Sequence, residues 1–408
     1  MTDRSWPIEK LGRTARIGNG STPRRDSTIY WDSGDVPWLN SSVVNKSRVT
    51  QAEQFVTAVA LRECHLPVVA PGSVLVGLTG QGKTRGMATI LDIEATLNQH
   101  IAYVTPDPSR WFPEYLLWSL RSAYDELRCL SEENGSTKGG LTCEALKQFR
   151  LVVPPFGYQR VIANYLDRET ARIDTLIEEQ QRLIELLRER RQALIDAAFS
   201  TLGGPQVQLR RHTQFLTSGS RGWGDYYADE GERFVRIGNL PRGNLDLRGD
   251  VQFVDLPADV TEGSRTMLEV GDLLFSITAY LGSVAVVGGD WVGAYVSQHV
   301  ALCRLESQNV DPRFIGWFML TTTGQDQLNE GAAGGAKMQL ALDDIRGLRV
   351  PFVAIDEQRS IAASLDGRTA KIDVLIAESE RFIELARERR SALITAAVTG
   401  QIDVREAA

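Results

Sequence analysis

The sequence predicts an α+β protein: two tandemly duplicated α/β domains, joined by two long helices that pair as an antiparallel coiled coil with pseudo-twofold symmetry. The first observation is an internal repeat, because residues 159–198 and 358–397 are identical at 26 of 40 positions, without a gap, at an offset of 199. Both copies lack proline and follow one, as helices often do. The preceding stretches alternate short apolar runs with Gly and Pro, which is typical of strands and loops.

The repeat extends weakly into the stretches that precede the two helical segments. Several short signatures recur at the same offset, and the register slips only between residues 80 and 97. The corresponding positions are Asn40 and Asn239, Gly72 and Gly271, Thr79 and Thr278, Gln99–His100 and Gln298–His299, and Gly135 and Lys138 with Gly334 and Lys337. The two stretches are therefore expected to share one fold while differing in most of their residues.

These signals divide the chain into alternating domains and helices. We expect a first domain at 1–155, a central helical segment at 156–202, a second domain at 203–352, a C-terminal helical segment at 353–402 and a tail at 403–408. Expected strands lie at 74–76, 101–104, 273–277 and 284–287, and expected helices at 111–130 and 312–328. Each domain ends in a Gly-rich loop and a short strand that leads to the proline.

The helical segments carry apolar residues at close to heptad spacing, so each helix is expected to need a partner helix. The other copy is the simplest partner, and the domain between them leaves either direction open. Antiparallel pairing would place the two domains at opposite ends. Gly367 and the acidic residues Asp167 and Asp174 are candidate positions for a kink. The residues expected to pair the helices or to meet a partner are Ile173, Leu176, Ile177, Leu183, Ile184, Leu187, Leu194, Ile372, Leu375, Ile376, Phe382, Ile383 and Leu393.

Composition excludes several protein classes. The 408 residues are 43% hydrophobic and 24% charged, which is ordinary for a globular protein. No apolar run is long enough for a membrane span, and the start lacks a secretory signal. Four scattered cysteines and four histidines, without metal-binding spacing, predict no metal site and fit a reducing cytoplasm. The net charge of −7 does not by itself indicate a nucleic-acid binder, although local basic clusters still can.

Residues 77–84, GLTGQGKT, match the G-x-x-x-x-G-K-[ST] pattern of a phosphate-binding loop. Such a loop must open a helix, but residues 85–91 read as a second strand, and the duplicate at 278–282 has no trace of the pattern. We therefore favour a Gly-rich hairpin that leaves Lys83 and Arg85 free to meet a phosphate backbone. A P-loop nucleotide-binding protein that uses Gly77 to Thr84 stays an alternative.

Two further motifs are interpreted as structural. Residues 152–156 match the P-P-[YF] part of an amino-methyltransferase motif, but Val153 stands where that motif has Asn or Asp. His100 and His299 lie beside Gln at strand starts, where a hydrogen-bonded structural role is usual. No nucleophile with an evident base stands out, so the sequence predicts a non-catalytic protein without a metal.

Basic and aromatic residues interleave in loops of both domains, partly at duplicated positions. Arg and Lys reach phosphates, whereas Arg, Asn and Gln can read base edges. As a set, these residues predict DNA recognition. The candidates are Arg24, Arg25, Tyr30, Trp38, Asn40, Gln81, Lys83, Arg85 and Lys138 in the first domain, and Arg221, Trp223, Tyr226, Arg236, Asn239, Tyr280 and Lys337 in the second.

Together these features resemble the specificity (S) subunit of type I restriction-modification systems, over essentially the whole chain. The most specific element is P-x-x-x-Q-R-x-I-A-x-x-L-D-x-x-T-A-x-I-D-x-L-I, from Pro155 and again around Pro351. The Gly-Ser-Thr-Lys-x-x-Leu loop at 135–141 and the Gly-Asp-Leu-Leu strand at 271–274, with its relative at 72–75, add to it. Two departures are mild: Tyr158 precedes Gln159 where Glu357 precedes Gln358, and the loop near Gly334 lacks the Ser-Thr pair.

The resemblance implies a division of labour. Each domain would be a target recognition domain for one half of a bipartite site in double-stranded DNA, and the helices would set the spacer and dock two methyltransferase (M) subunits. Restriction–translocase (R) subunits join in systems that also cleave, and the whole serves phage defence by DNA methylation and restriction. S-adenosylmethionine, ATP and magnesium would sit on the partners and none in this chain. A coiled-coil scaffold without DNA specificity is the other alternative.

Overall fold

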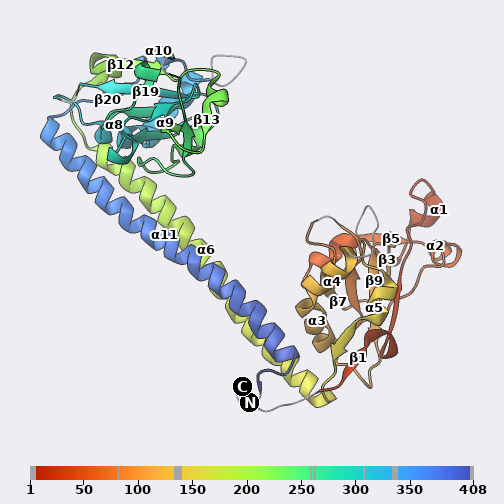
Figure 1. Cartoon of the computed structure of the whole chain (residues 1–408). Helices are drawn as coiled ribbons and strands as arrows, with labels where there is room; N and C mark the ends of the chain where they lie inside the picture. The colour runs from red at the N-terminus through yellow and green to blue at the C-terminus, as the bar shows by residue number, and fades with distance from the viewer. Residues whose placement is uncertain are drawn as a thin grey trace. The chain divides into compact units, whose positions relative to one another are not determined.

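The computed structural model describes residues 6–80, 82–132, 140–257, 260, 263–306, 308–332 and 339–404. The chain forms two compact units, Met1–Gln180 with Arg381–Ala408 (unit 1) and Gln181–Glu380 (unit 2). Two long helices, α6 (Phe156–Ser200) and α11 (Ile355–Val398), each contribute one half to either unit (Figure 1). Neither helix is interrupted at Asp167, Asp174 or Gly367, so the kink considered there is absent.

Unit 1 contains short strands, short helices and two 3-10 turns before α6. The strands are β1 (Ile8–Lys10), β2 (Ala15–Asn19), β3 (Val36–Leu39), β4 (Arg48–Val49), β5 (Gln54–Val56), β6 (Val74–Gly77), β7 (Ala88–Leu91), β8 (Thr96–Leu97), β9 (Ile101–Pro106) and β10 (Arg150–Val152). The helices are η1 (Leu11–Arg13), α1 (Thr28–Trp31), η2 (Ser41–Asn45), α2 (Ala58–Glu63), α3 (Pro113–Ser122), α4 (Tyr124–Glu132) and α5 (Cys143–Gln148).

Unit 2 repeats this order with local differences. The strands are β11 (Gln206–Gln208), β12 (Thr213–Ser218), β13 (Tyr227–Ala228), β14 (Glu232–Val235), β15 (Gln252–Val254), β16 (Leu273–Ser276), β17 (Val284–Val286), β18 (Tyr295–Val296), β19 (Val300–Leu305) and β20 (Arg349–Pro351). The helices are η3 (Leu209–Arg211), η4 (Trp223–Tyr226), η5 (Ile237–Asn239), α7 (Gly263–Thr266), η6 (Gly289–Trp291), α8 (Pro312–Met319), α9 (Thr322–Ala332) and α10 (Leu342–Gly347).

The two domains share one sheet topology. The larger sheet has the order β2-β9-β6-β7-β4 in unit 1, and β12-β19-β16-β17 in unit 2. A second sheet joins a central strand to one antiparallel and one parallel neighbour, as β3 joins β5 and β8, and β14 joins β15 and β18. A two-stranded ribbon, β1-β10 or β11-β20, brings the start of each domain beside its end. The predicted α/β duplication is confirmed.

The long helices belong to the cores of both units. In unit 1, sheet residues such as Val104 cluster with Trp111 and Tyr115, with Ile162 of α6 and with Ile394 of α11. Unit 2 repeats the cluster, with Phe314 and Trp317 of α8 packed against Ile195 of α6 and Leu365 of α11. Since burial of apolar area is the main stabilising term, each domain is held by the same helices that join the two units.

Ion pairs within each unit give the direction of helix pairing. In unit 1, Arg390 of α11 binds Asp174 of α6 through two contacts of 2.8 and 3.1 Å. In unit 2, Arg191 of α6 binds Asp373 of α11 at 2.7 and 3.2 Å. Arg188 of α6 pairs with Glu380 of α11 at 3.1 Å. From one ion pair to the next, the residue number therefore increases on one helix while it decreases on the other. The predicted antiparallel pairing is therefore confirmed.

The buried stripe on the helices is narrower than the heptad pattern suggested. Ile173, Ile177, Ile184 and Leu187 are buried on α6, as are Ile372 and Ile383 on α11, while Ile376, Leu194 and Leu393 are half-buried. Four residues of the expected set lie outside this buried stripe, with side chains that are 39–49% exposed, and for them contact with a partner stays a prediction. These are Leu176, Leu183, Leu375 and Phe382. The reason is geometric, because alternating steps of four and three residues keep one stripe inside and turn the neighbouring apolar line outward.

Candidate nucleic-acid interface

Three chain segments meet at the loop end of each domain. In unit 1, the backbone N–H of Leu78 donates to His100 O at 2.9 Å, and Leu78 O accepts from the N–H of Leu141 at 2.8 Å. These bonds join the loop after β6, the turn before β9 and the chain that follows the Gly-rich segment. In unit 2, Ile277 makes the same two bonds, to His299 and from Leu340, both at 3.0 Å.

The loop after β6 is a hairpin and not a nucleotide-binding loop. β6 pairs with β7 in antiparallel register, Val76 opposite Ala88, and the N–H of Gly86 donates to Gly77 O at 2.9 Å. A phosphate-binding loop needs a following helix whose N-terminal amides face the anion, and strand β7 follows here instead. Lys83 is exposed in this hairpin, as predicted. Arg85 is only 7% exposed, so the prediction of a free side chain there was wrong.

A basic and aromatic cluster covers the segment between β2 and β3. The guanidinium of Arg25 lies 4.2 Å from the ring centroid of Trp31 and 4.8 Å from that of Trp38, and it donates to Gln54 at 3.1 Å. Arg24 is exposed and forms an ion pair with Asp26 at 3.0 Å. Both arginines are therefore held near the surface, where they can reach a phosphate.

Three other candidates of the first domain have local structural partners. Tyr30 donates from its hydroxyl to Glu63 at 2.9 Å, and this hydrogen bond to a carboxylate raises the pKa of Tyr30. Trp38 is 2% exposed and donates to Ser21 O, so it is a core residue and not a DNA contact. Asn40 caps η2 by accepting from the N–H of Ser42 at 2.9 Å. Gln81 and Lys138 lie outside the described residues.

In unit 2, too, some candidate residues are buried in the core and others are exposed. Trp223 is 4% exposed and stacks on Phe234 with a centroid distance of 5.6 Å, and Tyr226 packs against this cluster half-buried. Asn239 is 3% exposed, and its amide donates to Arg248 O and Asp250 O at 3.0 Å.

The side-chain carbonyl of Asn239 accepts from the backbone N–H of Arg236, whose own side chain is half-buried. All polar atoms of the Asn239 amide therefore serve the fold of the loop around η5. For Trp223 and Asn239 the prediction of DNA contact was wrong, because neither side chain has a free surface.

The exposed candidates of unit 2 are Arg221 and Tyr280. Tyr280 is 55% exposed and has a φ of 55°, a backbone conformation that costs energy for a bulky side chain. The guanidinium of Arg242 lies 4.1 Å from the Tyr280 ring centroid, which places a cation and an aromatic face together. Lys337 lies outside the described residues.

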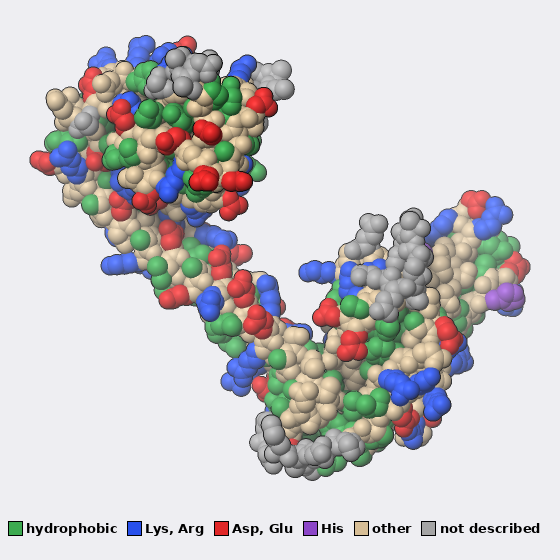
Figure 2. Space-filling model, in the orientation of Figure 1, with side chains coloured by type: hydrophobic (Ala, Val, Ile, Leu, Met, Phe, Trp, Pro, Cys, Tyr) green, Lys and Arg blue, Asp and Glu red, His purple; other side chains and the backbone are tan. Residues whose placement is uncertain are grey.

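A basic cavity in unit 2 was not predicted. It has a volume of about 850 Å³, and Arg188, Arg191, Arg242 and Arg248 line it together with Asp373 and Glu380. A cavity of about 530 Å³ in unit 1 is lined by Arg387 and Arg390, which correspond to Arg188 and Arg191 at the offset of 199. Nothing in the local sequence marks Arg248, because folding brings it to α6 and α11. Figure 2 shows basic and acidic side chains interspersed on the surface of both units.

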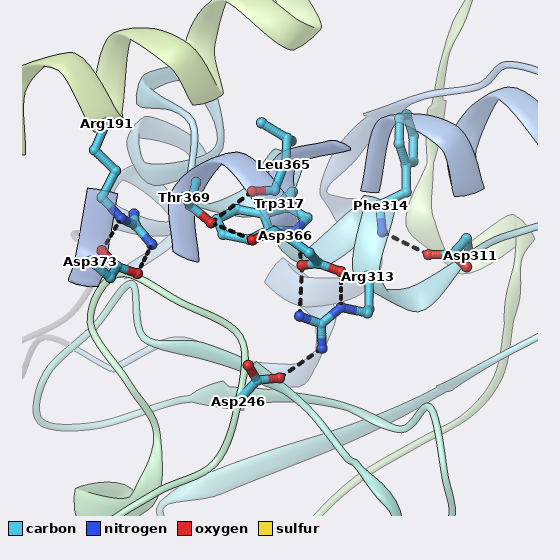
Figure 3. A network of polar contacts seen from close by, with 10 residues as sticks. All are labelled: Arg191, Asp246, Asp311, Arg313, Phe314, Trp317, Leu365, Asp366, Thr369 and Asp373. Atoms are coloured by element: carbon cyan, nitrogen blue, oxygen red, sulfur yellow. Dashed lines mark hydrogen bonds and ion pairs between the residues drawn. The ribbon is translucent and has the colours of Figure 1, made fainter. Parts of the chain in front are cut away.

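The motif shared by the helices attaches each domain to its helix pair. In unit 2, Asp366 accepts from Arg313 at 2.8 and 2.7 Å and from the indole N–H of Trp317 at 2.8 Å (Figure 3). Arg313 also reaches Asp246, and Thr369 donates to Leu365 O. In unit 1, Trp118 donates to Asp167 at 2.8 Å and Thr170 to Leu166 O at 2.6 Å. The conspicuous carboxylates of the motif are therefore structural.

A buried glutamine completes each attachment. Gln159, at the start of α6, accepts from the N–H of Phe112 and donates to Arg110 O and Pro154 O at 2.8–2.9 Å. Gln358, at the start of α11, makes the same three contacts with Asp311, Asn309 and Val353. Their side chains are 0% and 1% exposed. The orientation of each loop end relative to its own helix segments is thus fixed by matched buried contacts.

Two observations bear on metal and thiol chemistry in the part of the chain that the structure describes. Within the described ranges, no three His, Cys, Asp or Glu side chains are grouped so that they could hold a metal ion. Cys303 is buried, and burial raises the pKa of its thiol to about 12, so it stays protonated and unreactive at neutral pH. No helix among the described residues is long and apolar enough to cross a membrane.

Comparisons with known proteins agree with this architecture. Residues 4–187 match the family model described as the type I restriction modification DNA specificity domain. The Escherichia coli EcoR124I/EcoR124II specificity subunit is 21% identical over 191 residues, which is 47% of this chain and 47% of that protein. The Escherichia coli EcoBI specificity subunit is 20% identical over 362 residues, 82% of this chain and 74% of that protein.

Solved structures share the fold over nearly the whole chain. One chain, from work on complex assembly and conformational transition of the type I R-M system, matches with a TM-score of 0.77 at 14% identity, covering 97% of this chain and 98% of that one. The HsdS subunit from Thermoanaerobacter tengcongensis matches with a TM-score of 0.60 at 14% identity, covering 98% of both chains. Residues 4–187 thus match the type I restriction modification DNA specificity domain, and the whole chain, with its duplicated domains and helices, is similar to type I restriction enzyme specificity subunits.

Proposed function

We propose that this chain selects the DNA site of a type I restriction-modification complex, with each domain reading one half of a bipartite sequence. The observation that carries the proposal is the combination of a duplicated frame with different loops. The bonds at Leu78 and Ile277 correspond at an offset of 199, but the hairpin beside them carries Lys83 in unit 1 and Tyr280 in unit 2. A common frame with different exposed side chains suits two domains that bind one type of ligand with two sequence preferences.

The chemistry belongs to partner subunits in this proposal. Methylation of adenine N6 needs a flipped base and a methyltransferase site that holds S-adenosylmethionine, while ATP and magnesium serve restriction subunits where these are present. This chain supplies the choice of site and the connection between partners, and it is not itself an enzyme. We place the complex in the cytoplasm, where the DNA is.

The test is to co-express this chain with the methyltransferase subunit encoded beside it and to map N6-methyladenine across the host genome. A split motif, with two short fixed halves and a constant gap, is the expected result. Unchanged methylation, with both proteins soluble and associated, would contradict the proposal and leave a scaffold without DNA specificity. Nucleotide binding is not proposed as a second function, because the hairpin geometry of residues 77–86 does not favour it.

The first prediction concerns the exposed cations of the loop end. Replacing Arg24, Arg25 and Lys83 together with Ala is expected to weaken binding to every duplex by at least about tenfold near 0.1 M salt, because each cation that meets a phosphate releases a counterion. The slope of log affinity against log salt should fall by roughly 0.9 for each phosphate that is no longer neutralised. Fluorescence anisotropy over a salt series measures both.

A charge-matched control uses other exposed basic residues of unit 1. Arg13, Lys147 and Arg150 are exposed in η1, α5 and β10, outside the loops that carry Arg24, Arg25 and Lys83. Replacing these three with Ala removes the same net charge. The affinity for DNA should change less than about threefold, because only the long-range attraction between the protein's net charge and DNA is reduced. Equal losses of DNA affinity in the two triple variants would show that Arg24, Arg25 and Lys83 make no direct contact with phosphates.

Two matched sets of exposed apolar side chains on α6 and α11 support docking of two methyltransferase subunits. In unit 1, Leu176, Phe382 and Leu385 are 39–53% exposed on α6 and α11. In unit 2, the corresponding residues at an offset of 199 are Leu375, Leu183 and Leu186, which are 40–53% exposed. Exposed apolar side chains on a helix are typical of a protein-binding surface, and two matched sets fit two copies of one partner.

The number of methyltransferase subunits bound to each chain tests these two sets of side chains. The double variant Leu183→Asp and Leu186→Asp is expected to bind one methyltransferase subunit where the native chain binds two, because charges on an apolar contact remain desolvated and unpaired. Phe382→Asp with Leu385→Asp should have the same effect, and all four changes together should abolish association. Light scattering on a sizing column measures the mass of each complex. Gln181→Asp, an exposed position on α6, should leave two partners bound.

A further inference from the structure

A polar cluster of three side chains is duplicated at the loop ends, and it includes the two histidines that the sequence assigned to a structural role. In unit 1 the cluster is Thr79, Gln99 and His100, and in unit 2 it is Thr278, Gln298 and His299. We call each set a Thr–Gln–His corner. Thr79 Oγ1 lies 3.0 Å from His100 Nδ1, and Gln99 Nε2 lies 3.2 Å from His100 Nε2. The second corner has both contacts, at 3.1 Å.

The contacts determine which groups donate. An amide nitrogen is only a donor, so the Gln99 amide donates to an unprotonated Nε2 of His100. The neutral ring then carries its proton on Nδ1, which donates to the Thr79 hydroxyl oxygen. The Thr79 O–H proton finds no acceptor among the described residues, and the second N–H of the Gln99 amide is likewise left unused there. Each corner thus presents a free hydroxyl donor and a free amide donor on opposite sides of the imidazole, and no carboxylate.

The corners lie at the surface and on a rigid base. Gln99 and His299 are exposed, and the other four side chains are half-buried. The chain that leaves β2 passes so close to the strand below that a Cβ at Gly20 would collide with Leu97 O. Gly219, at the offset of 199, has the same restriction against Val296 O. A donor pair on such a base loses little conformational entropy when it binds, because it is already ordered.

We infer that each Thr–Gln–His corner binds a phosphate of the DNA backbone independently of base sequence. A Thr hydroxyl whose proton is free fits a ligand that only accepts hydrogen bonds, and the phosphate oxygen is such a group and is negatively charged. The corners are the same in both units, whereas the neighbouring hairpins differ. What is common to two domains that read different half-sites can contact only what is common to the half-sites, which is the sugar-phosphate backbone. This inference rests on the proposed function.

The test is a mutant cycle between a protein hydroxyl and a DNA phosphate. Thr79→Val removes the donor and keeps the shape of the side chain, and Thr79→Ser restores the hydroxyl. In the complex with the methyltransferase subunit, Thr79→Val should weaken binding to specific and non-specific duplexes alike by about tenfold, the effect of one hydrogen bond to a charged acceptor. Thr79→Ser should bind like the native chain, and the methylated sequence should not change.

Methylphosphonate duplexes, in which one phosphate at a time is made neutral, locate the contact. One position in the first half-site should weaken the native protein but leave Thr79→Val unaffected, and Thr278→Val should couple in the same way to one position in the second half-site. Thr50→Val, at an exposed threonine of unit 1, is the control. It should bind DNA with native affinity, and each methylphosphonate should weaken it as much as it weakens the native protein.

Three outcomes overturn the inference, and a fourth concerns the proposed function alone. A changed base preference at one position of the motif would make the corner a base-reading element. Unchanged DNA affinity with an intact fold would show that the corner has only a structural role. Affinity loss without coupling to any single phosphate would indicate an indirect effect. Failure of the native complex to select any bipartite site would instead contradict the proposed function, and this would be known before any variant is made.

Discussion

Trp317→Ala is expected to destabilise unit 2 by about 3–5 kcal/mol, the usual cost of removing a buried tryptophan. Trp317 is 1% exposed, packs between the sheet and the long helices, and donates its indole N–H to Asp366 at 2.8 Å. Its removal leaves a cavity and takes away one of the donors that hold the Asp366 carboxylate. The domain should detach from its helix segments before unit 1 is affected.

Hydrogen exchange with mass spectrometry measures this locally, which a single melting temperature does not, because two units need not unfold in one transition. Amides of β16, β19 and α8 should exchange faster in Trp317→Ala, and those of β6, β9 and α3 should not. Trp118→Ala, whose indole donates to Asp167, should give the mirror result. Trp317→Phe keeps most of the packing and should cost about 1–2 kcal/mol. Equal exchange in both units of Trp317→Ala would argue against independent attachment.

In the methylation assay the same variant is expected to relax only the second half of the motif. The first domain keeps its own attachment through Trp118 and Gln159, so its half-site should still be required. Genome-wide mapping of N6-methyladenine would then show fewer fixed bases on one side of the gap or lower occupancy at the original sites. A change confined to the first half would contradict the assignment of one domain to each half.

Gln159→Leu is expected to cost about 3–9 kcal/mol, although it conserves side-chain size. The side chain is fully buried and satisfies one N–H and two carbonyl groups of the backbone. Each buried polar group left without a partner costs about 1–3 kcal/mol, so leucine leaves the junction of the domain with α6 with three such groups. Urea denaturation of the full chain, followed by exchange of the α3 and α6 amides, measures the effect.

Gln358→Leu is the matched variant in unit 2 and should destabilise that unit by a similar amount, because its three contacts are equivalent. Gln181→Leu, at an exposed position on α6, serves as the control and should change stability by less than about 0.5 kcal/mol. If Gln159→Leu were as mild as that control, water or a shifted backbone would be satisfying the three groups, and the motif glutamine would need another explanation.

The shared helical motif shows why some residues could be interpreted from sequence and others could not. Its repetition at an offset of 199 predicted the duplication, the two long helices and their pairing with each other. The individual roles of Asp167 and Gln159 did not follow, because Trp118 and Phe112 are their partners and lie about 50 residues away in the chain. Arg248 is likewise far from Arg191 in the sequence. The two side chains line one cavity only after the chain has folded, so the sequence did not predict it.

The candidate DNA contacts divide according to burial, which residue type alone does not reveal. Trp38, Trp223 and Asn239 have chemistry that suits DNA, yet each is at most 4% exposed because the domains are small and need large side chains and caps in their cores. Arg24, Arg25 and Lys83 stay at the surface, since an unpaired cation is costly to bury. Exposure therefore removed Trp38, Trp223, Asn239 and Arg85 as free side chains and left Arg24, Arg25, Lys83, Arg221 and Tyr280 at the surface.

The sequence by itself determined the repeat, the order of domains and helices, and the resemblance to a family, because these depend on patterns that are read along one chain. The tertiary structure decided which face of each helix is buried, and it brought Thr79 to His100 and Thr278 to His299. Contacts of that kind join residues that are far apart in the chain, so they arise only when strands pair and pack. A hydrogen-bonded corner has no signature in local periodicity, whereas a helix does.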